Sequence, residues 1–207
     1  MPPIMYGLNK PYLSWSALSL WQQSQARYRK QYYEKSPRFN NIYTRFGKKI
    51  HDRLEKDPTF LPDIDRVGLR EQSIEGVLEG VHLKGFVDYI DLRIPLIRDY
   101  KTSKKQWTVA DVAKNKQLVF YSVLVEQEFG IPVDEVDILW LETKEKAKEE
   151  KIGGVAINTT PELNLSGHYE IIKRPEPVSA LEKEEMKEWI ITNAQAILED
   201  YKSYLAS

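Results

Sequence analysis

The stretch LKGFVDYIDLRIPLIRDYK, residues 83–101, contains two strand-like runs that meet at a short junction. The first run covers residues 83–92 and the second covers residues 94–101, and both are rich in β-branched and aromatic residues. The junction at 91–95 is short enough for a tight turn, so we expect the two runs to pair as antiparallel neighbours. This pair decides the fold, because the other predicted elements are arranged around it.

Three ionisable residues lie on these two strands. Asp88 interrupts an otherwise apolar strand, while Asp99 and Lys101 are two residues apart and project from one face of the next. If the strands pair, the two carboxylates come close, which destabilises a sheet unless a cation lies between them. A divalent cation held by such oxygens can activate water against a phosphodiester, and a lysine can stabilise the developing charge. A lone Asp-x-Lys tripeptide more often marks a solvated strand face.

The remaining elements follow from apolar periodicity and from turn residues. The sequence predicts helices over about 14–34, 42–56, 108–129 and 180–204, and strands over 67–77, 136–141 and 168–173. The charged stretch 142–151 is expected to be an exposed loop. This order predicts an α/β fold: a mixed central sheet with one crossover helix, and helical additions at both ends.

We expect one domain over residues 1–207. Its parts are a helical N-terminal part (1–60), a catalytic sheet with the crossover helix (61–142), and a loop, strand and C-terminal helix (143–207). The length is sufficient for one core with helical additions.

The composition excludes several kinds of site. Of the 207 residues, 42% are hydrophobic and 29% charged, as in an ordinary soluble globular protein. There is no cysteine, which excludes disulfides, thiolate zinc sites, cysteine-ligated iron–sulfur clusters and cysteine nucleophiles. No apolar run approaches the roughly 20 residues of a membrane span, and the N-terminus lacks the features of a signal peptide. We therefore expect a cytoplasmic protein without a membrane partner.

Charge is distributed unevenly along the chain. Residues 1–60 contain eleven Lys and Arg against four Asp and Glu, although the net charge is −1. With its interleaved aromatic residues, this basic part could follow phosphates and stack on bases. A solvated helix surface with the aromatic residues packed inward gives the same pattern, and on charge alone it is the commoner case.

Four short motifs follow one another along the chain. They are Gly47-Lys48-Lys49-Ile50-His51, Gly85-Phe86-Val87-Asp88, Arg98-Asp99-Tyr100-Lys101-Thr102-Ser103 and Gln117-Leu118-x-x-Tyr121. Together they resemble the PD-(D/E)XK nuclease superfamily, and within it the RecB-like exonuclease branch. Leu13-Ser14-Trp15-Ser16 also resembles the opening helix of that branch. The resemblance covers residues 13–141 and implies a restriction-endonuclease-like core.

The resemblance implies a metal site built from both strands and a helix. His51, Asp88 and Asp99 would bind the metal, and the main-chain carbonyl of Tyr100 would complete its coordination. Lys101 would orient the attacking water or stabilise the transition state. The expected cofactor is Mg²⁺ or Mn²⁺, and an imidazole ligand suits Mn²⁺ slightly better because it is softer than a carboxylate.

Further residues are expected around that metal site. Gln117 and Tyr121 share one helix face, and the resemblance implies that they support catalysis and approach the DNA backbone. The expected DNA contacts are Ser14 in the opening helix and the segment directly after the catalytic strand, with Lys104, Lys105 and Trp107. For that segment, a phosphate-gripping loop that stacks a base and a solvated turn with one anchoring tryptophan remain equally open.

Other readings remain open for three positions. A single histidine such as His51 is usually a core-edge residue bonded to a carbonyl, although its place in Gly-x-x-x-His favours a ligand. Gln117 and Tyr121 could form only a satisfied hydrogen-bonding pair. Glu71, on the first strand, lies where the family often has an acid near the metal, but it could equally occupy a solvated strand position.

One feature departs from the pattern of many relatives. These carry an iron–sulfur cluster with one cysteine in the first helix and three near the C-terminus. Ser24 stands at the position that matches the first cysteine, followed by Gln25 in place of the usual proline. We therefore expect a cluster-free member whose C-terminal helix is held by packing.

Three functional hypotheses follow. The first is a Mg²⁺- or Mn²⁺-dependent deoxyribonuclease, an exonuclease on single-stranded or frayed DNA ends in recombination, repair or replication. The second is a non-catalytic nucleic-acid-binding accessory subunit of a recombination or CRISPR-type complex, although the intact Asp88, Asp99 and Lys101 speak against a decayed site. The third is a protein-interaction domain that binds through its acidic C-terminal helix. The expected partners are DNA and a further protein of such a complex.

Overall fold

The computed structural model describes residues 4–8, 10–34, 36, 41–57, 59–64, 67–152 and 155–207; within 147–161 it describes the backbone alone. Five strands form one sheet in the order β1-β2-β3-β4-β5. They are β1 (Leu69–Leu78), β2 (Val81–Asp91), β3 (Leu96–Ser103), β4 (Glu135–Ile152) and β5 (Val155–Lys173). β3 and β4 run parallel, and the other neighbouring strands are antiparallel. The predicted α/β fold with a mixed sheet is confirmed.

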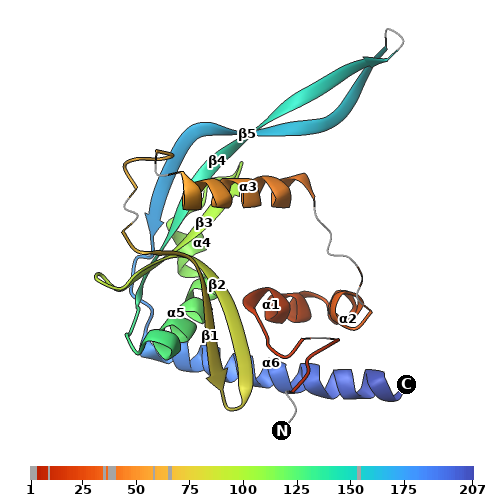
Figure 1. Cartoon of the computed structure of the whole chain (residues 1–207), viewed down its shortest axis with the longest axis vertical. Helices are drawn as coiled ribbons and strands as arrows, with labels where there is room; N and C mark the ends of the chain where they lie inside the picture. Colours follow the sequence, from red (N-terminus) through yellow and green to blue (C-terminus); the bar gives the residue numbers. More distant parts are fainter. Residues whose placement is uncertain are drawn as a thin grey trace.

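Six helices cover the two faces of this sheet (Figure 1). They are α1 (Trp15–Gln23), α2 (Gln25–Tyr32), α3 (Ile42–Lys56), α4 (Val109–Ala113), α5 (Lys116–Phe129) and α6 (Ala180–Ala206). α4 and α5 make the crossover from β3 to β4 that a parallel pair requires. α5 packs on β1, β2 and β3 with α6 against it, while α3 packs on β3 and β5.

Each face of the sheet has its own hydrophobic core. The larger core joins α1, α2, α5 and α6 to the sheet, and it includes the fully buried Leu18, Phe120 and Ile197. The smaller core lies under α3, where Ile50 and Leu54 pack with Tyr100. A short parallel bridge between Leu13 and Leu83 adds the N-terminal segment to the edge of β2.

Contacts between side chains of the terminal helices hold α6 in place. Trp15 of α1 lies 5.7 Å from Trp189 of α6, measured between ring centroids. Arg29 of α2 donates a hydrogen bond of 2.9 Å to Asp200, and the hydroxyl of Tyr33 donates to the main-chain oxygen of Ile197. These contacts provide the packing that a chain without cysteine needs at its C-terminal helix.

Two helices predicted as continuous are each divided in the structure. The helix predicted over 14–34 breaks at Ser24, whose hydroxyl accepts a hydrogen bond from the main chain of Arg27 and begins α2. The helix predicted over 108–129 breaks at Asn115, whose side chain accepts from the main chain of Gln117 and begins α5. Both predictions were wrong because short polar side chains compete with the helical hydrogen bonds of the backbone.

The prediction of an exposed loop over 142–151 was also wrong. This stretch continues β4, which pairs with β5 out to Ile152↔Val155. β5 therefore begins well before the strand predicted over 168–173. In Figure 1 the two strands form a long ribbon that projects beyond α3. Charge density does not distinguish a loop from a ribbon with solvent on its faces, because main-chain pairing with β5 stabilises the ribbon.

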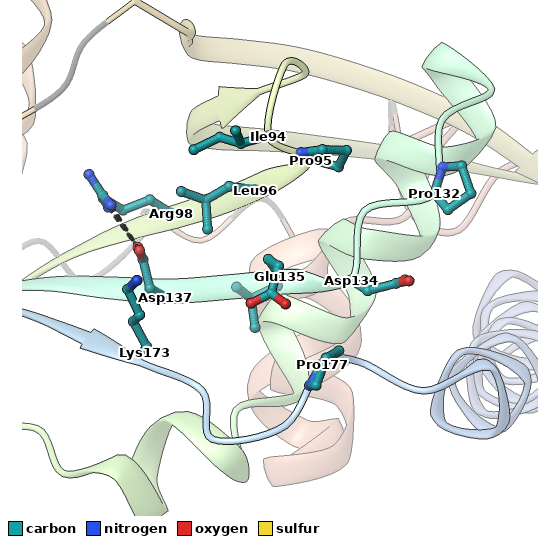
Figure 2. A pocket seen from close by; sticks show the side chains of 11 residues that line it. Ile94, Pro95, Leu96, Arg98, Pro132, Asp134, Glu135, Asp137, Lys173 and Pro177 are labelled. Carbon is teal, nitrogen blue, oxygen red and sulfur yellow. Dashed lines mark hydrogen bonds and ion pairs between the residues drawn. The ribbon is translucent and has the colours of Figure 1, made fainter.

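A buried ion pair joins the two parallel strands. Arg98 of β3 donates two hydrogen bonds to Asp137 of β4, at 2.6 and 2.8 Å, and both side chains are almost fully buried. Figure 2 shows the two side chains pointing toward one another beside Lys173. They border a cavity of about 620 Å³ where β3 and β4 begin and β5 ends. The bidentate pair fixes the register of β3 against β4.

We expect Arg98→Met to destabilise the protein by about 3–5 kcal/mol, because it leaves the Asp137 carboxylate buried without its partner. Urea denaturation would measure the free energy of unfolding. The matched control is Lys187→Met, which removes a surface pair with Glu184 and should cost less than about 1 kcal/mol. Equal losses in the two variants would contradict the role given to the buried pair.

α6 begins with a capping box. The hydroxyl of Ser179 accepts from the main chain of Glu182, and the Glu182 carboxylate accepts from the main chain of Ser179. Glu182 also pairs with Arg174. The pair with Arg174 and the bonds from Ser179 outweigh the effect of burial and lower the pKa of Glu182 from 4.5 to about 2.

This lowered pKa predicts a pH dependence of stability. The contribution of the Glu182 carboxylate is fully present above its ordinary pKa of 4.5 and is lost as the pH falls toward about 2. We therefore expect Glu182→Gln to be less stable than wild type at pH 7, with the difference vanishing toward pH 2. Thermal unfolding across this pH range would measure it. Glu185→Gln, at an exposed position of the same helix, is the control and should show no such trend.

No helix in the described part of the chain combines the length and the apolar character that a membrane crossing requires.

Candidate metal centre and the lysine beside it

β2 and β3 diverge at the point where the candidate site lies. Among the described residues, their register ends at Tyr89↔Arg98. Beyond this pair, a side chain replaces main-chain pairing, because Oδ2 of Asp88 accepts a hydrogen bond of 2.5 Å from the main-chain N–H of Tyr100. Asp88 is only 8% exposed. It is therefore a buried carboxylate fixed between two separating strands.

α3 brings His51 to the same place. The helix packs on the sheet through Ile50 and Leu54, so the next position faces the diverging strands. Nε2 of His51 lies 3.1 Å from the main-chain oxygen of Tyr100, and Nδ1 lies 3.3 Å from Oδ1 of Asp88. Both sequence interpretations thus describe part of the geometry: His51 contacts a carbonyl at the edge of a core, and it also faces a carboxylate.

Glu71 of β1 completes the cluster. It lies opposite Asp88, between the register pairs Arg70↔Tyr89 and Gln72↔Val87. Its φ is 46°, in the left-handed backbone region that residues other than glycine adopt at a cost of roughly 1–3 kcal/mol. Oε1 of Glu71 is buried, accepts no hydrogen bond from the described residues, and lies 3.6 Å from Nδ1 of His51.

The three side chains form one compact group of possible ligands. One donor atom from each of His51, Glu71 and Asp88 lies within 4.8 Å of the other two. Burial lowers the pKa of His51, but hydrogen bonding to Asp88 and the negative charges of Asp88 and Glu71 outweigh this effect and raise it to about 10. A proton on the imidazole therefore balances two carboxylates that would otherwise repel each other, and it would leave when a cation binds, because only the neutral ring is a ligand.

A second group of polar side chains begins at Asp99 on β3. Its Oδ2 lies 2.6 Å from Nζ of Lys101, and Lys101 donates a hydrogen bond of 3.2 Å to Oε1 of Gln117. Nε2 of Gln117 donates in turn to the hydroxyl of Tyr121 at 2.9 Å. Burial raises the pKa of Asp99 to about 6, although Lys101 opposes this shift. The predicted residues Asp99, Lys101, Gln117 and Tyr121 are thus joined in one chain of contacts.

The structure places Asp99 beside the compact group of His51, Glu71 and Asp88 rather than within it. The charge of Asp88 contributes to the raised pKa of Asp99 and the charge of His51 opposes it, so the three groups act on one another electrostatically. The residue that joins the cluster instead is Glu71, which the sequence left open. Its signal was only positional, since alternation along β1 does not reveal the left-handed turn that directs its side chain inward. The metal role of Asp99 remains a prediction.

The expected DNA contacts lie farther out. Lys104 pairs with Glu145 of β4, to which Tyr43 of α3 also donates. Lys105 is exposed, and Trp107 is partly buried against the larger core. Trp107 thus packs against the core with part of its surface, and the side chain of Lys105 is exposed to solvent.

A cavity of about 250 Å³ adjoins Gln117 and Tyr121, and we call it the side cavity. Ser14, one of the expected DNA contacts, lines it. It is also lined by Tyr12, Lys84 and Phe86, which sequence reasoning did not single out. For Lys84 and Phe86 the sequence held a signal, because these two residues flank Gly85 of the Gly-x-x-Asp motif.

The residues of the cluster fit a divalent cation. Two carboxylates and an imidazole are the oxygen and nitrogen donors that Mg²⁺ and Mn²⁺ accept. The buried oxygen of Glu71, which accepts no hydrogen bond from the described residues, is a donor that a cation would satisfy. The donor set therefore matches the cofactor expected from the sequence, and it includes Glu71.

Comparison with known proteins identifies the superfamily of this chain. The family model of the PD-(D/E)XK nuclease superfamily matches residues 59–204, so the chain belongs to that superfamily. No curated protein sequence matches it. Among solved structures, the protein SSO0001 aligns with a TM-score of 0.46 and 10% identity, over 89% of this chain and 76% of the other. The "Putative exonuclease" from Eubacterium rectale aligns with a TM-score of 0.39 and 17% identity, over 88% of this chain and 65% of the other.

We expect Mn²⁺ to stabilise the wild-type protein against heat, by about 2.7 kcal/mol when its concentration is 100 times the dissociation constant. Glu71→Gln should lose most of this stabilisation, because it removes a charged donor from the cluster. Glu75→Gln makes the same substitution at an exposed position of β1 and should keep it. Unfolding midpoints with and without Mn²⁺ measure the effect. An undiminished shift in Glu71→Gln would exclude this residue as a ligand.

Proposed function

We propose that the protein is a metal-dependent deoxyribonuclease that hydrolyses DNA phosphodiester bonds with Mg²⁺ or Mn²⁺. The observation that carries this proposal is the compact group of His51, Glu71 and Asp88 next to the ion pair of Asp99 and Lys101. In a member of a nuclease superfamily, this arrangement supplies both metal donors and a positioned cation. We further propose that the whole chain is one nuclease domain.

The side chains divide the chemical work between them. His51, Glu71 and Asp88 would hold the cation, with Asp99 and the carbonyl of Tyr100 as further oxygen donors. When bound, the cation polarises the phosphate and lowers the pKa of the attacking water. The residues that would hold this cation therefore come from β1, β2 and α3, and β3 would add Asp99 and the carbonyl of Tyr100.

Lys101 acts on the phosphate rather than on the metal. Oδ2 of the buried Asp99 lies 2.6 Å from its ammonium group, and the acceptor oxygen of Gln117 fixes its direction. Tyr121 fixes the amide of Gln117 in turn, through the hydrogen bond from Nε2. A lysine held from two sides is preorganised to stabilise the charge that develops on the phosphate in the transition state.

The kind of DNA substrate is a further part of the proposal. We propose an exonuclease acting on single-stranded or frayed DNA ends in recombination, repair or replication, with Ser14, Lys104, Lys105 and Trp107 contacting the DNA. The resemblance to RecB-like exonucleases supports this proposal. The alternative is a non-catalytic DNA-binding subunit of a recombination or CRISPR-type complex. The intact contacts around Lys101 favour catalysis, because a site that only bound DNA would not need them.

Cleavage of labelled single- and double-stranded DNA with Mn²⁺ or Mg²⁺ tests the proposal. We expect Lys101→Ala to lose about 10²- to 10³-fold in kcat, because it removes a charge that acts in the transition state. Asp99→Ala should also lose activity, since it releases Lys101 from its partner.

Lys202→Ala changes an exposed lysine of α6 and should cleave like wild type. Circular, linear and end-blocked substrates distinguish exonuclease from endonuclease activity. If wild type and both site variants bind DNA but are equally inert with either metal, the catalytic proposal is wrong and the accessory-subunit alternative holds.

A further inference from the structure

We propose that the side cavity holds the unpaired nucleotide adjacent to the scissile phosphate, and that Phe86 stacks against its base. This inference rests on the proposed function and specifies its substrate as DNA with an unpaired nucleotide at the site. The cavity is about 250 Å³ in volume, and its lining comes from the N-terminal segment, α1, β2 and α5.

The cavity opens on an interrupted edge of β2. At one end of the strand, Leu13 bridges to β2 through hydrogen bonds of 2.8 Å with His82 and Lys84. At the other end, pairing with β3 begins at Tyr89. Between these two partners lies the stretch 85–88, and no strand among the described residues pairs with that edge. The gap ends at Asp88, which belongs to the compact group of His51, Glu71 and Asp88.

The wall on the side of α5 belongs to both the cavity and the catalytic contacts. Gln117 and Tyr121 line the cavity, and Gln117 also accepts the hydrogen bond from Lys101. Tyr121 approaches β2 closely because residue 85 is glycine: a Cβ at this position would lie 3.1 Å from the ring of Tyr121. A nucleotide in the cavity would therefore be separated from Lys101 by a single side chain.

The lining has the chemistry of a nucleotide site. Phe86 is 56% exposed, which is unusual for a phenylalanine on a central strand and leaves a ring face open for stacking. Nζ of Lys84 lies 5.8 Å from the centroid of the Phe86 ring and 5.9 Å from that of Tyr12. Lys84 also pairs with Glu75, at the rim of the β1–β2 hairpin.

Charge on the two sides of the gap is complementary to a nucleic-acid strand. The residues that line the side cavity include two lysines and no acid. The compact group of His51, Glu71 and Asp88 contains two carboxylates, and these would bind a phosphate only through a cation. A strand could thus place one phosphate at the metal and its neighbour near Lys84. The cavity accommodates a single nucleotide, and a base inside a duplex would first have to leave its stack at a cost of a few kcal/mol. Single-stranded DNA avoids this cost.

The test combines a protein variant with a modified substrate. Affinity for a fluorescein-labelled single-stranded oligonucleotide is measured with Ca²⁺, and cleavage with Mn²⁺. Phe86→Ala should weaken binding roughly tenfold or more, as expected for loss of a base–aromatic stack, while Phe86→Trp should retain it. Wild type should lose a similar factor on an oligonucleotide with an abasic residue next to the cleaved bond. Phe86→Ala should lose little further there, because the two changes remove one interaction.

Leu181→Ala, at an exposed apolar position of α6, is the control and should bind like wild type. The proposal is overturned if Phe86→Ala binds normal and abasic DNA as wild type does, or if its loss is unchanged on the abasic strand. If wild type does not bind DNA, both this inference and the proposed function fail. Binding that depends on Phe86 without cleavage by wild type would support the inference and contradict the nuclease activity.

Discussion

The hydrogen bond from the main chain of Tyr100 to the carboxylate of Asp88 determines the geometry of the site. It occurs where β2 and β3 separate, so a side chain satisfies a main-chain donor that the sheet no longer pairs. Because the carboxylate is used in this way, it is held in a fixed direction. Its other oxygen is left to face His51. The same separation opens the edge of β2 on which the side cavity lies.

Packing on the two faces of the sheet holds this opening in place. On one face, α5 lies close to β2 because Gly85 has no side chain, and this brings Gln117 and Tyr121 over the gap. On the other face, α3 presents His51 one position after a residue of the smaller core. The buried pair of Arg98 and Asp137 fixes β3 against β4 at the point where β3 begins to diverge from β2. The elements next to the opening are thus held by packing on both faces of the sheet and by the buried ion pair.

Much of this arrangement could be predicted from local patterns. The paired strands around Asp88 and Asp99, the helix that carries His51 and the mixed sheet all follow from apolar periodicity, which reports burial directly. The helix breaks at Ser24 and Asn115 were missed, because a polar side chain can cap a helix or face solvent with the same local sequence. The ribbon over 142–151 was missed because its pairing partner lies later in the chain.

The composition of the candidate site was predictable only in part. Their spacing along one strand placed Asp99 and Lys101 on the same face, and in the structure Oδ2 of Asp99 lies 2.6 Å from Nζ of Lys101. Glu71 could not be assigned, since its direction depends on a left-handed backbone conformation that alternation does not encode. Phe86 was overlooked for a different reason: on a strand with mostly buried neighbours, its exposure results from the missing partner strand at that edge.

The smaller core under α3 has a thermodynamic consequence for the cation. His51 is the only member of the compact donor group that α3 supplies, and Ile50 and Leu54 are the buried apolar residues of that helix. If the compact donor group binds the proposed cation, docking of α3 and binding of the cation are linked equilibria, and each strengthens the other by the same factor. The affinity of the site is consequently a property that can be tuned from a distance, through apolar side chains that never touch the metal.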